Sequence, residues 1–161
     1  MRIHPLGLGC AGLATALLAP AASATPSQGQ PECEGPPGPV RLYVEVEGVR
    51  SSSGRIAVTV YPDERRRFLA KGGSLYVGRV TARAGRTRVC LQLPRPGTYA
   101  FAVYHDADGD RGFDKNRLGL PAEAYGFSRN PATLFGLPNF SSVRMNVPRS
   151  HVVTRVKLTY P

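Results

Sequence analysis

Apolar and polar residues alternate along much of this chain, and the alternation predicts short β-strands. Residues 41–47 place apolar side chains at positions 42, 44 and 46 between charged or polar ones, as in a half-buried strand. The pattern returns at residues 56–60 after a Ser- and Gly-rich turn, so the two segments form a hairpin. Further strands are expected at residues 75–82, 87–93, 98–104, 143–147 and 152–160.

This arrangement of about seven short strands with frequent turns and no long helix predicts an all-β fold, an antiparallel two-sheet β-sandwich. A small β-barrel is the alternative. Two segments interrupt the pattern. At residues 62–71, Asp63 is expected to cap a short helical turn whose Phe68 and Leu69 close one end of the sandwich. Residues 119–140 are expected to form a long ordered loop, which is more often functional than idle.

The N-terminus has the pattern of a secretory signal peptide at residues 1–24. Arg2 is followed by an apolar stretch at residues 6–18 and by small residues at 22–24, where cleavage is expected. The apolar stretch is too short to span a bilayer. We therefore expect an exported protein, periplasmic or extracellular, with no transmembrane segment, a Pro/Gly-rich linker at residues 25–39 and a single domain at residues 40–161.

Two cysteines remain after the expected cleavage, Cys33 and Cys90. An oxidising compartment favours a disulfide between them. A metal site or a reactive thiol is the alternative, but neither cysteine has His or Cys neighbours at ligand spacing. Cys90 alternates with the inward-facing Val89 and Leu91, so it should point outward, where the N-terminal segment can reach it.

The chain is basic, with 21 Lys and Arg against 11 Asp and Glu and a formal net charge of +10. Such a surface attracts anionic partners, and in an exported protein these include an anionic envelope glycopolymer or another envelope protein. Nucleic acid is not expected, because no aromatic stripe accompanies the basic residues.

The residues with the most distinctive chemistry follow the apolar segment 98–104. Asp106, Asp108, Asp110 and Asp114 occupy positions 1, 3, 5 and 9 of a calcium loop, a spacing that turns successive oxygens toward one hard cation. Carboxylates this close repel one another unless a counter-charge neutralises them. The sequence therefore predicts a Ca²⁺ site.

The match to an EF-hand is incomplete, because the positions that hold Gly and Glu in an EF-hand carry Arg111 and Arg117 here. No helix pattern flanks the loop either. We therefore expect a different kind of calcium loop, with Glu123 as its late carboxylate. The alternative is a plain Asp/Gly-rich turn that binds no metal.

The segments around this loop closely resemble an uncharacterised bacterial secreted family, the domain-of-unknown-function family numbered two-one-four-one. The resemblance rests on a Pro-Gly-Thr-Tyr turn within residues 93–99, the His-Asp pair at 105–106, the acidic loop, the Gly-Leu-Pro of 119–121 and the Tyr-Gly-Phe-Ser of 125–128. The turn is also similar to a strand connection of transthyretin-like and collagen-adhesin B-type sandwiches, which implies the fold and no function.

Three kinds of function are compatible with these residues. A hydrolase would use His105 and Asp106, but the sequence shows no nucleophile elbow, zinc motif or phosphate-binding loop, so we expect no enzyme activity. A binding module would use Tyr125, Phe127 and Ser128, the aromatic rings stacking on a ligand if they are exposed and otherwise plugging the end of the sandwich. A structural component would pair through exposed edge strands. Our expectation is a non-catalytic, Ca²⁺-dependent binding or structural module of the cell envelope.

Overall fold

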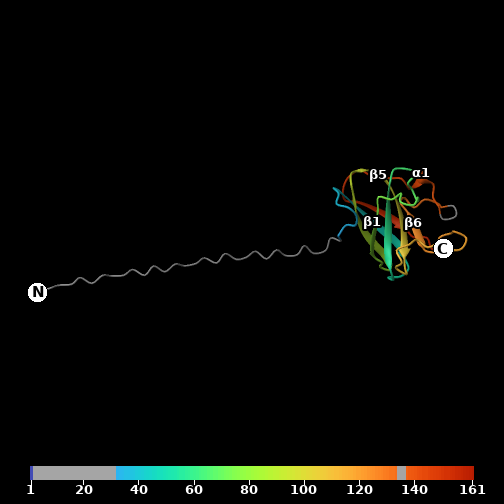
Figure 1. The fold of residues 1–161 in the computed structure, drawn as a ribbon, viewed down its shortest axis with the longest axis horizontal. Coiled ribbons are helices and arrows are strands. Elements are labelled where there is room, and N and C mark those ends of the chain that lie inside the picture. The colour runs from blue at the N-terminus through green and yellow to red at the C-terminus, as the bar shows by residue number, and fades with distance from the viewer. Residues whose placement is uncertain (2–31, 134–136) are drawn as a thin grey trace. The chain divides into compact units, whose positions relative to one another are not determined.

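The computed structural model describes Met1, residues 32–133 and residues 137–161. Apart from Met1, the expected signal peptide lies outside the described residues, as do residues 25–31 of the expected linker. Residues 32–161 contain two β-sheets packed face to face (Figure 1). The two-sheet sandwich predicted from the alternation is confirmed, and the sheets do not close into a barrel.

One sheet has three strands in the order β4-β1-β8, and the other has five. In the five-stranded sheet the order is β3-β2-β5-β6, and β7 pairs with another part of β5. The elements, in chain order, are β1 (Val40–Val49), β2 (Arg55–Pro62), β3 (Tyr76–Thr81), β4 (Gly85–Leu93), β5 (Gly97–Asp106), β6 (Ala124–Phe127), α1 (Phe140–Val143), β7 (Met145–Val147) and β8 (Val152–Lys157).

The strands differ from the sequence prediction in several places. The expected loop at residues 119–140 contains β6, which is too short for its periodicity to stand out. The strand expected at 143–147 begins only at Met145, because α1 precedes it. The β1–β8 pair is parallel, whereas the other strand pairs are antiparallel. This follows from the path of the chain, which leaves the five-stranded sheet at β7 and enters the other sheet beside β1.

The core lies between the sheets and consists of the apolar side chains that the alternation places inward. Burial of this apolar surface is the main term favouring the fold. The fully buried side chains include Leu42, Val44 and Val46 of β1, Ile56, Val58 and Val60 of β2, Val89, Leu91 and Leu93 of β4, and Phe101 and Val103 of β5.

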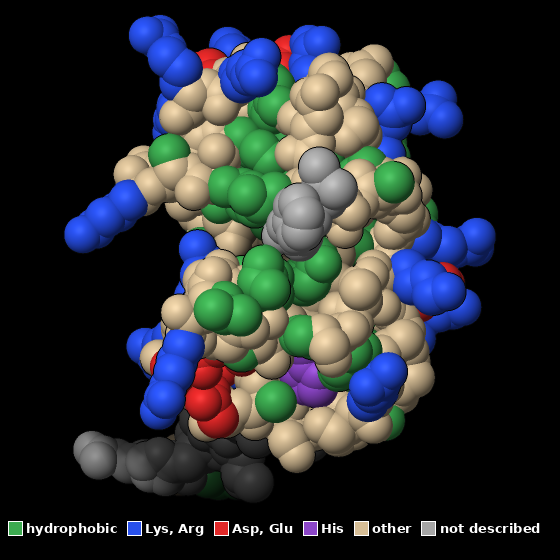
Figure 2. Space-filling view, turned by 90° about the vertical axis from the view of Figure 1, so that its right-hand side faces the viewer, with side chains coloured by type: hydrophobic (Ala, Val, Ile, Leu, Met, Phe, Trp, Pro, Cys, Tyr) green, Lys and Arg blue, Asp and Glu red, His purple; other side chains and the backbone are tan. Residues whose placement is uncertain are grey.

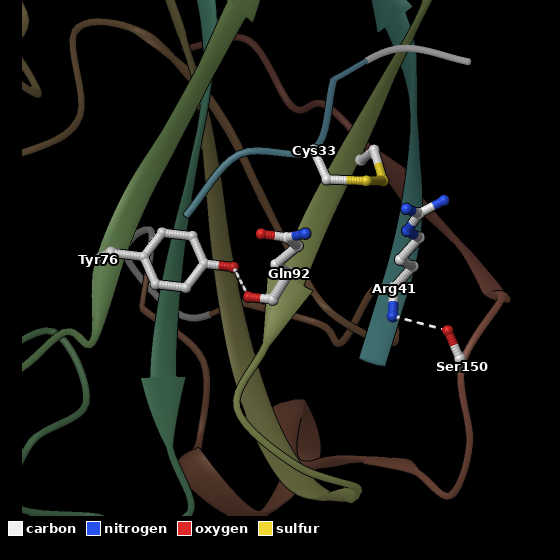
Figure 3. Close-up of a disulfide and its surroundings, with 6 residues drawn as sticks. Cys33, Arg41, Tyr76, Gln92 and Ser150 are labelled. Carbon is white, nitrogen blue, oxygen red and sulfur yellow. Dashed lines mark hydrogen bonds between the residues drawn. A yellow bond between two sulfur atoms is a disulfide. The ribbon is translucent and has the colours of Figure 1, made fainter. Parts of the chain in front are cut away.

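The N-terminal segment is attached to the sandwich by a disulfide between Cys33 and Cys90, which confirms the expected pairing (Figure 3). Next to it, the Glu34 N–H donates to the Cys90 carbonyl at 2.8 Å, and the Gln92 N–H donates to the Glu34 carbonyl at 2.9 Å. The Tyr76 hydroxyl of β3 donates to the Gln92 carbonyl. The segment thus lies along the edge of β4 and links it to β3.

A second cluster of apolar side chains lies outside the main core, on the outer face of the five-stranded sheet. Phe68 packs there against Tyr61 and Phe127, with ring centroids 5.2 and 6.2 Å away. Residues 64–70 form tight turns, as expected, but they cover this outer face and not the end of the sandwich. Leu69 is 40% exposed, and Asp63 pairs with Arg144 and does not act as a cap. The predicted roles of Asp63 and Leu69 were therefore wrong.

Candidate functional site

The outer face of the five-stranded sheet is hollow because its central side chains are small. Thr59 of β2 pairs with Ala102 of β5, and Ala102 pairs with Phe127 of β6. One row away, Tyr104 pairs with Tyr125. The large aromatic rings thus lie beside the small side chains of Thr59 and Ala102. A cavity of about 1630 Å³ lies over this part of the sheet. We call this cavity the groove.

Three segments outside the sheet form the walls of the groove: residues 65–71, residues from 111–121, and residues 137–140. In Figure 2 hydrophobic side chains gather around a hollow on the face turned toward the viewer, and Lys and Arg side chains project near its margins. Four basic residues line the groove, Arg65 and Lys71 from one segment and Arg111 and Lys115 from another. No Asp or Glu is among the described residues that line it.

Aromatic rings form a continuous series along the groove. Phe113 lies 5.5 Å from Tyr104 and 6.4 Å from Tyr125, measured between ring centroids. Tyr125 is 5.9 Å from Phe127, and Phe127 is 6.2 Å from Phe68. The planes of these neighbouring rings are inclined at 61–81°, the edge-to-face packing that aromatic pairs prefer. The series joins the acidic loop to the turns at residues 64–70.

The acidic loop begins where β5 ends, at Asp106, whose side chain is fully buried. One carboxylate oxygen of Asp106 accepts from the Gly109 N–H at 2.8 Å, and the other accepts from the Arg111 N–H at 3.1 Å. These bonds hold the loop in a tight turn in which both Gly109 and Arg111 have positive φ, at 80° and 70°. Asp106 is therefore a structural element of the loop, whatever else it binds.

The five carboxylates singled out in the sequence lie close together in two overlapping groups. Within each group one oxygen from every carboxylate lies within 4.8 Å of the others. The first group is Asp106, Asp108 and Glu123, and the second is Asp108, Asp110 and Asp114. Glu123, which is distant in sequence from the aspartates, is attached to the loop because it accepts from the Asp114 N–H at 3.1 Å.

The pKa values of two of these carboxyl groups, Asp114 and Glu123, are raised. The pKa of Asp114 is raised first by the charge of Asp110, then by desolvation and by Asp108 and Asp106. Burial is the main cause of the raised pKa of Glu123, and Asp106, Asp114 and Asp108 add to it. The arrangement thus concentrates negative charge that a cation would neutralise.

The two residues of the hydrolase hypothesis face in different directions. His105 pairs with the core residue Ile56, whereas Asp106, the next residue of the same strand, lies on the opposite face. The His105 side chain is buried, with Nδ1 3.2 Å from the Tyr160 hydroxyl and Nε2 2.9 Å from the Ser53 carbonyl oxygen. Both ring nitrogens are therefore in contact with protein atoms, and the pair is not arranged as a base and its orienting carboxylate.

The three residues expected to bind a ligand have different environments. Tyr125 is half-buried and lines the groove, and Phe127 lines it while mostly buried. Ser128 is fully buried, and its hydroxyl accepts from the Phe101 N–H at 3.0 Å and donates to the Val143 carbonyl. Ser128 does not line the groove. Neither ring plugs an end of the sandwich, because both lie on the outer face of the sheet.

Sequence reasoning missed the walls and the centre of the groove. Ala100 and Ala102 alternate with the large Phe101 and Val103 in β5, so one face of this strand carries only small side chains between its ends. This contrast in side-chain size could have predicted a concave surface on that face of the sheet. The contribution of Phe68 and Phe113 was not readable, because these residues lie in irregular segments and reach the sheet only through the fold.

These observations define a small β-sandwich domain with an acidic loop at one strand end and a concave, aromatic outer face. The bacterial family described as uncharacterized proteins conserved in bacteria (DUF2141) matches residues 44–155, and the chain belongs to this family. The matched region includes the acidic loop and the groove. No curated protein and no solved structure was found to match the chain. Among the described residues, no helix has the length and apolar character needed to cross a membrane.

Proposed function

We propose that this protein is an exported, non-catalytic binding module of the bacterial cell envelope and that Ca²⁺ bound by its acidic loop stabilises the binding face. The proposal rests on one observation: the acidic loop carries the clustered carboxylates and also forms a wall of the groove. Its carboxylates gather in the two groups described above, while Arg111, Phe113 and Lys115 of the same loop line the groove. An ion in the loop would therefore fix a wall of the groove.

The chemistry of the carboxylates supports calcium. Ca²⁺ takes six to eight oxygen ligands in flexible geometry, and Asp and Glu carboxylates are its usual side-chain ligands. Asp106, Asp108, Asp110, Asp114 and Glu123 would hold the ion, with Asp106 using its second lone pairs because its first already accept N–H bonds. The ion would remove the repulsion that is the main cause of the raised pKa of Asp114 and that adds to the effect of burial on the pKa of Glu123.

The remaining features support a binding role in the envelope. Catalysis is disfavoured by the position of His105, whose ring nitrogens both contact protein atoms. The pattern of residues 1–24 supports export, and the charge of +10 supports an anionic partner such as an envelope glycopolymer or an acidic envelope protein.

Calorimetry and terbium luminescence on the chain without residues 1–24 test the calcium site. We expect saturable binding of Ca²⁺ and a melting temperature that rises with Ca²⁺ and falls in EDTA. Asp108→Asn and Asp114→Asn should each weaken Ca²⁺ binding at least tenfold, because each removes a charged ligand. Glu64→Gln, which removes an exposed acid outside the loop, should leave binding unchanged. If Ca²⁺ neither binds nor shifts the melting temperature, the loop is a plain turn.

A further inference from the structure

We infer that the groove binds a single-chain amphipathic anion of the fatty-acid type, with the chain against the aromatic rings and the carboxylate among the basic residues of the walls. The inference rests on the proposed binding function and names its ligand class. It follows from the size of the groove, its apolar lining, the packing of its aromatic rings and the sign of the charge on its lining.

The size of the groove indicates an extended ligand. At about 1630 Å³ it exceeds the roughly 300–1,000 Å³ of ordinary small-molecule pockets. It runs across three neighbouring strands, from Tyr61 of β2 to Tyr125 of β6, and between walls from three separate segments. An extended chain lying across the sheet would use this length, whereas a compact ligand would fill only part of it.

The lining of the groove is mainly apolar, and several of its large hydrophobic side chains contact water. Leu137 is 62% exposed, Leu69 is 40% exposed and Phe113 is 37% exposed, and all three line the same groove. Single exposed hydrophobic residues are ordinary, but a group of them around one concavity marks a binding site. Their exposure favours a ligand with an apolar body.

The packing of the aromatic rings disfavours a glycan, and two polar side chains of the groove already form hydrogen bonds within the protein. The Tyr104 hydroxyl donates to the Arg111 carbonyl and accepts from Arg79, and the Asn139 side chain accepts from the Ser141 N–H at the start of α1. The rings of Phe113, Tyr125 and Phe127 lie edge to face, so they form no flat platform on which a sugar would stack. An acyl chain needs neither hydrogen bonds nor a platform.

The charge of the walls determines the head group. Arg65, Lys71, Arg111 and Lys115 are exposed, and none of them forms a salt bridge with an acidic side chain of the described residues. No Asp or Glu of the described chain lines the groove, so the charge carried by its lining is positive. An anionic head group complements it, and a carboxylate accepts hydrogen bonds from both Lys and Arg.

Matched ligands separate the contributions of chain and charge. Calorimetry would compare decanoate, decanol and decyltrimethylammonium, all below their micellar concentrations, in Ca²⁺ and again in EDTA. We expect decanoate to bind at least tenfold more tightly than decanol and decyltrimethylammonium to bind most weakly. Equal binding of the three ligands would overturn the inference, because it would show that charge has no role.

Variants test the location of the site. Ala102→Trp places a large ring at the small centre of the groove and should weaken decanoate binding at least tenfold. Val153→Trp adds the same ring to the exposed outer face of the other sheet and should have no effect. The pair Lys71→Gln and Lys115→Gln should remove most of the preference for decanoate over decanol, whereas Lys157→Gln, on β8, should not. Unchanged binding in Ala102→Trp would place the ligand elsewhere and overturn the inference.

These experiments distinguish a failure of the calcium proposal from a failure of the proposed ligand class. If Ca²⁺ binds and decanoate does not, the calcium site stands and the ligand class is wrong. If decanoate binds equally in Ca²⁺ and EDTA, the ligand class stands and its dependence on calcium is wrong. Alginate serves as the competing anionic glycan, and tight alginate binding that Ala102→Trp abolishes would replace the fatty acid by a glycopolymer.

Discussion

The carboxylates of the acidic loop differ in burial, and this difference separates a structural role from a role in charge. Asp106 and Asp108 both belong to the predicted calcium spacing, and the sequence does not distinguish them. In the structure Asp106 is fully buried and both of its oxygens accept backbone N–H bonds, whereas Asp108 is exposed and accepts one, from Asp110. Asp106 therefore contributes to the fold of the loop even without an ion, and Asp108 contributes mainly charge.

Replacing these two residues should separate the two roles. In EDTA, Asp106→Ala should lower the free energy of unfolding by about 1–3 kcal/mol, because it leaves the N–H groups of Gly109 and Arg111 without their acceptor. Asp108→Ala should cause no such loss in EDTA, because it removes a repelling charge. Urea denaturation measures both. Equal losses for the two variants would show that Asp106 has no special structural role.

Ser128 provides a second test at the residue scale. Its buried hydroxyl joins β5 to the end of α1 through the Phe101 N–H and the Val143 carbonyl. Ser128→Ala should cost about 1–3 kcal/mol in urea denaturation, because both backbone groups lose a partner in a buried place. Ligand binding by the folded variant should be unchanged. Altered decanoate affinity with unchanged stability would return Ser128 to the binding site.

At the scale of elements, the N-terminal segment has an effect beyond its length. Gly78 of β3 accommodates it, since a Cβ at this position would lie 2.7 Å from the Glu34 Cβ. The Arg79 N–H donates to the Glu34 side chain at 3.2 Å. The disulfide therefore holds in place a segment that contacts both sheets.

Removing the disulfide should destabilise the whole domain. Cys33 and Cys90 are 57 residues apart, and a cross-link closing a loop of this size contributes about 2–4 kcal/mol. The double variant Cys33→Ala/Cys90→Ala should lose this amount in urea denaturation. Reductant should lower the stability of the wild type similarly and leave the variant unchanged. If reductant does not affect the wild type, the cross-link has no stabilising role.

The Asp63–Arg144 pair links the end of β2 to the residue after α1. The Arg144 guanidinium donates two hydrogen bonds to the Asp63 carboxylate, and these lower the pKa of Asp63. A carboxyl group whose pKa is lowered by folding stabilises the folded protein at pH values above its unfolded pKa, which is about 4. This stability is lost as the pH falls through the pKa of the folded state.

Arg144→Gln should therefore melt at a lower temperature than the wild type at pH 7, and the difference should shrink below about pH 4 as Asp63 becomes protonated. Thermal melts from pH 7 to pH 3 measure this change, with Arg149→Gln as the matched control outside the pair. A difference that stays constant across this range would mean that the pair contributes nothing through charge.

The sequence predicts those strands that are long enough for the alternation of apolar and polar residues to be recognised. Alternation located the strands around Val44, Val58 and Leu91, and cysteine counting located the disulfide. The short β6 and α1 were missed, because a few residues carry no period. The carboxylates could be grouped from the spacing of Asp106 to Asp114, but the groove depends on Phe68, Phe113 and Ala102 meeting across the sheet. Tertiary packing determines such contacts, and no local sequence pattern predicts them.

At the scale of the whole molecule, the sandwich covers several edges that could pair with another chain. Thr159 exchanges two backbone hydrogen bonds with Tyr125 and so covers β6, and Glu34 covers β4. At β8, the Asn130 side chain imitates a neighbouring strand: its amide donates to the Arg155 carbonyl at 3.1 Å, and its oxygen accepts from the Lys157 N–H at 2.8 Å. Exposed edges are sites of unwanted association, so these contacts favour a binding module over an assembly component that pairs through its strands.

Removing the Asn130 side chain should expose the edge of β8. Asn130 has a φ of 49°, which glycine adopts freely, so Asn130→Gly removes the amide without straining the backbone. We expect sedimentation velocity to show a concentration-dependent increase in self-association of the variant over the wild type, since Arg155 and Lys157 regain free backbone groups. Ala132→Gly, in an exposed part of the following segment, is the matched control and should behave as the wild type. If Asn130→Gly associates no more than the wild type, the charged side chains of β8 protect its edge without the help of Asn130, as charges on other edge strands do.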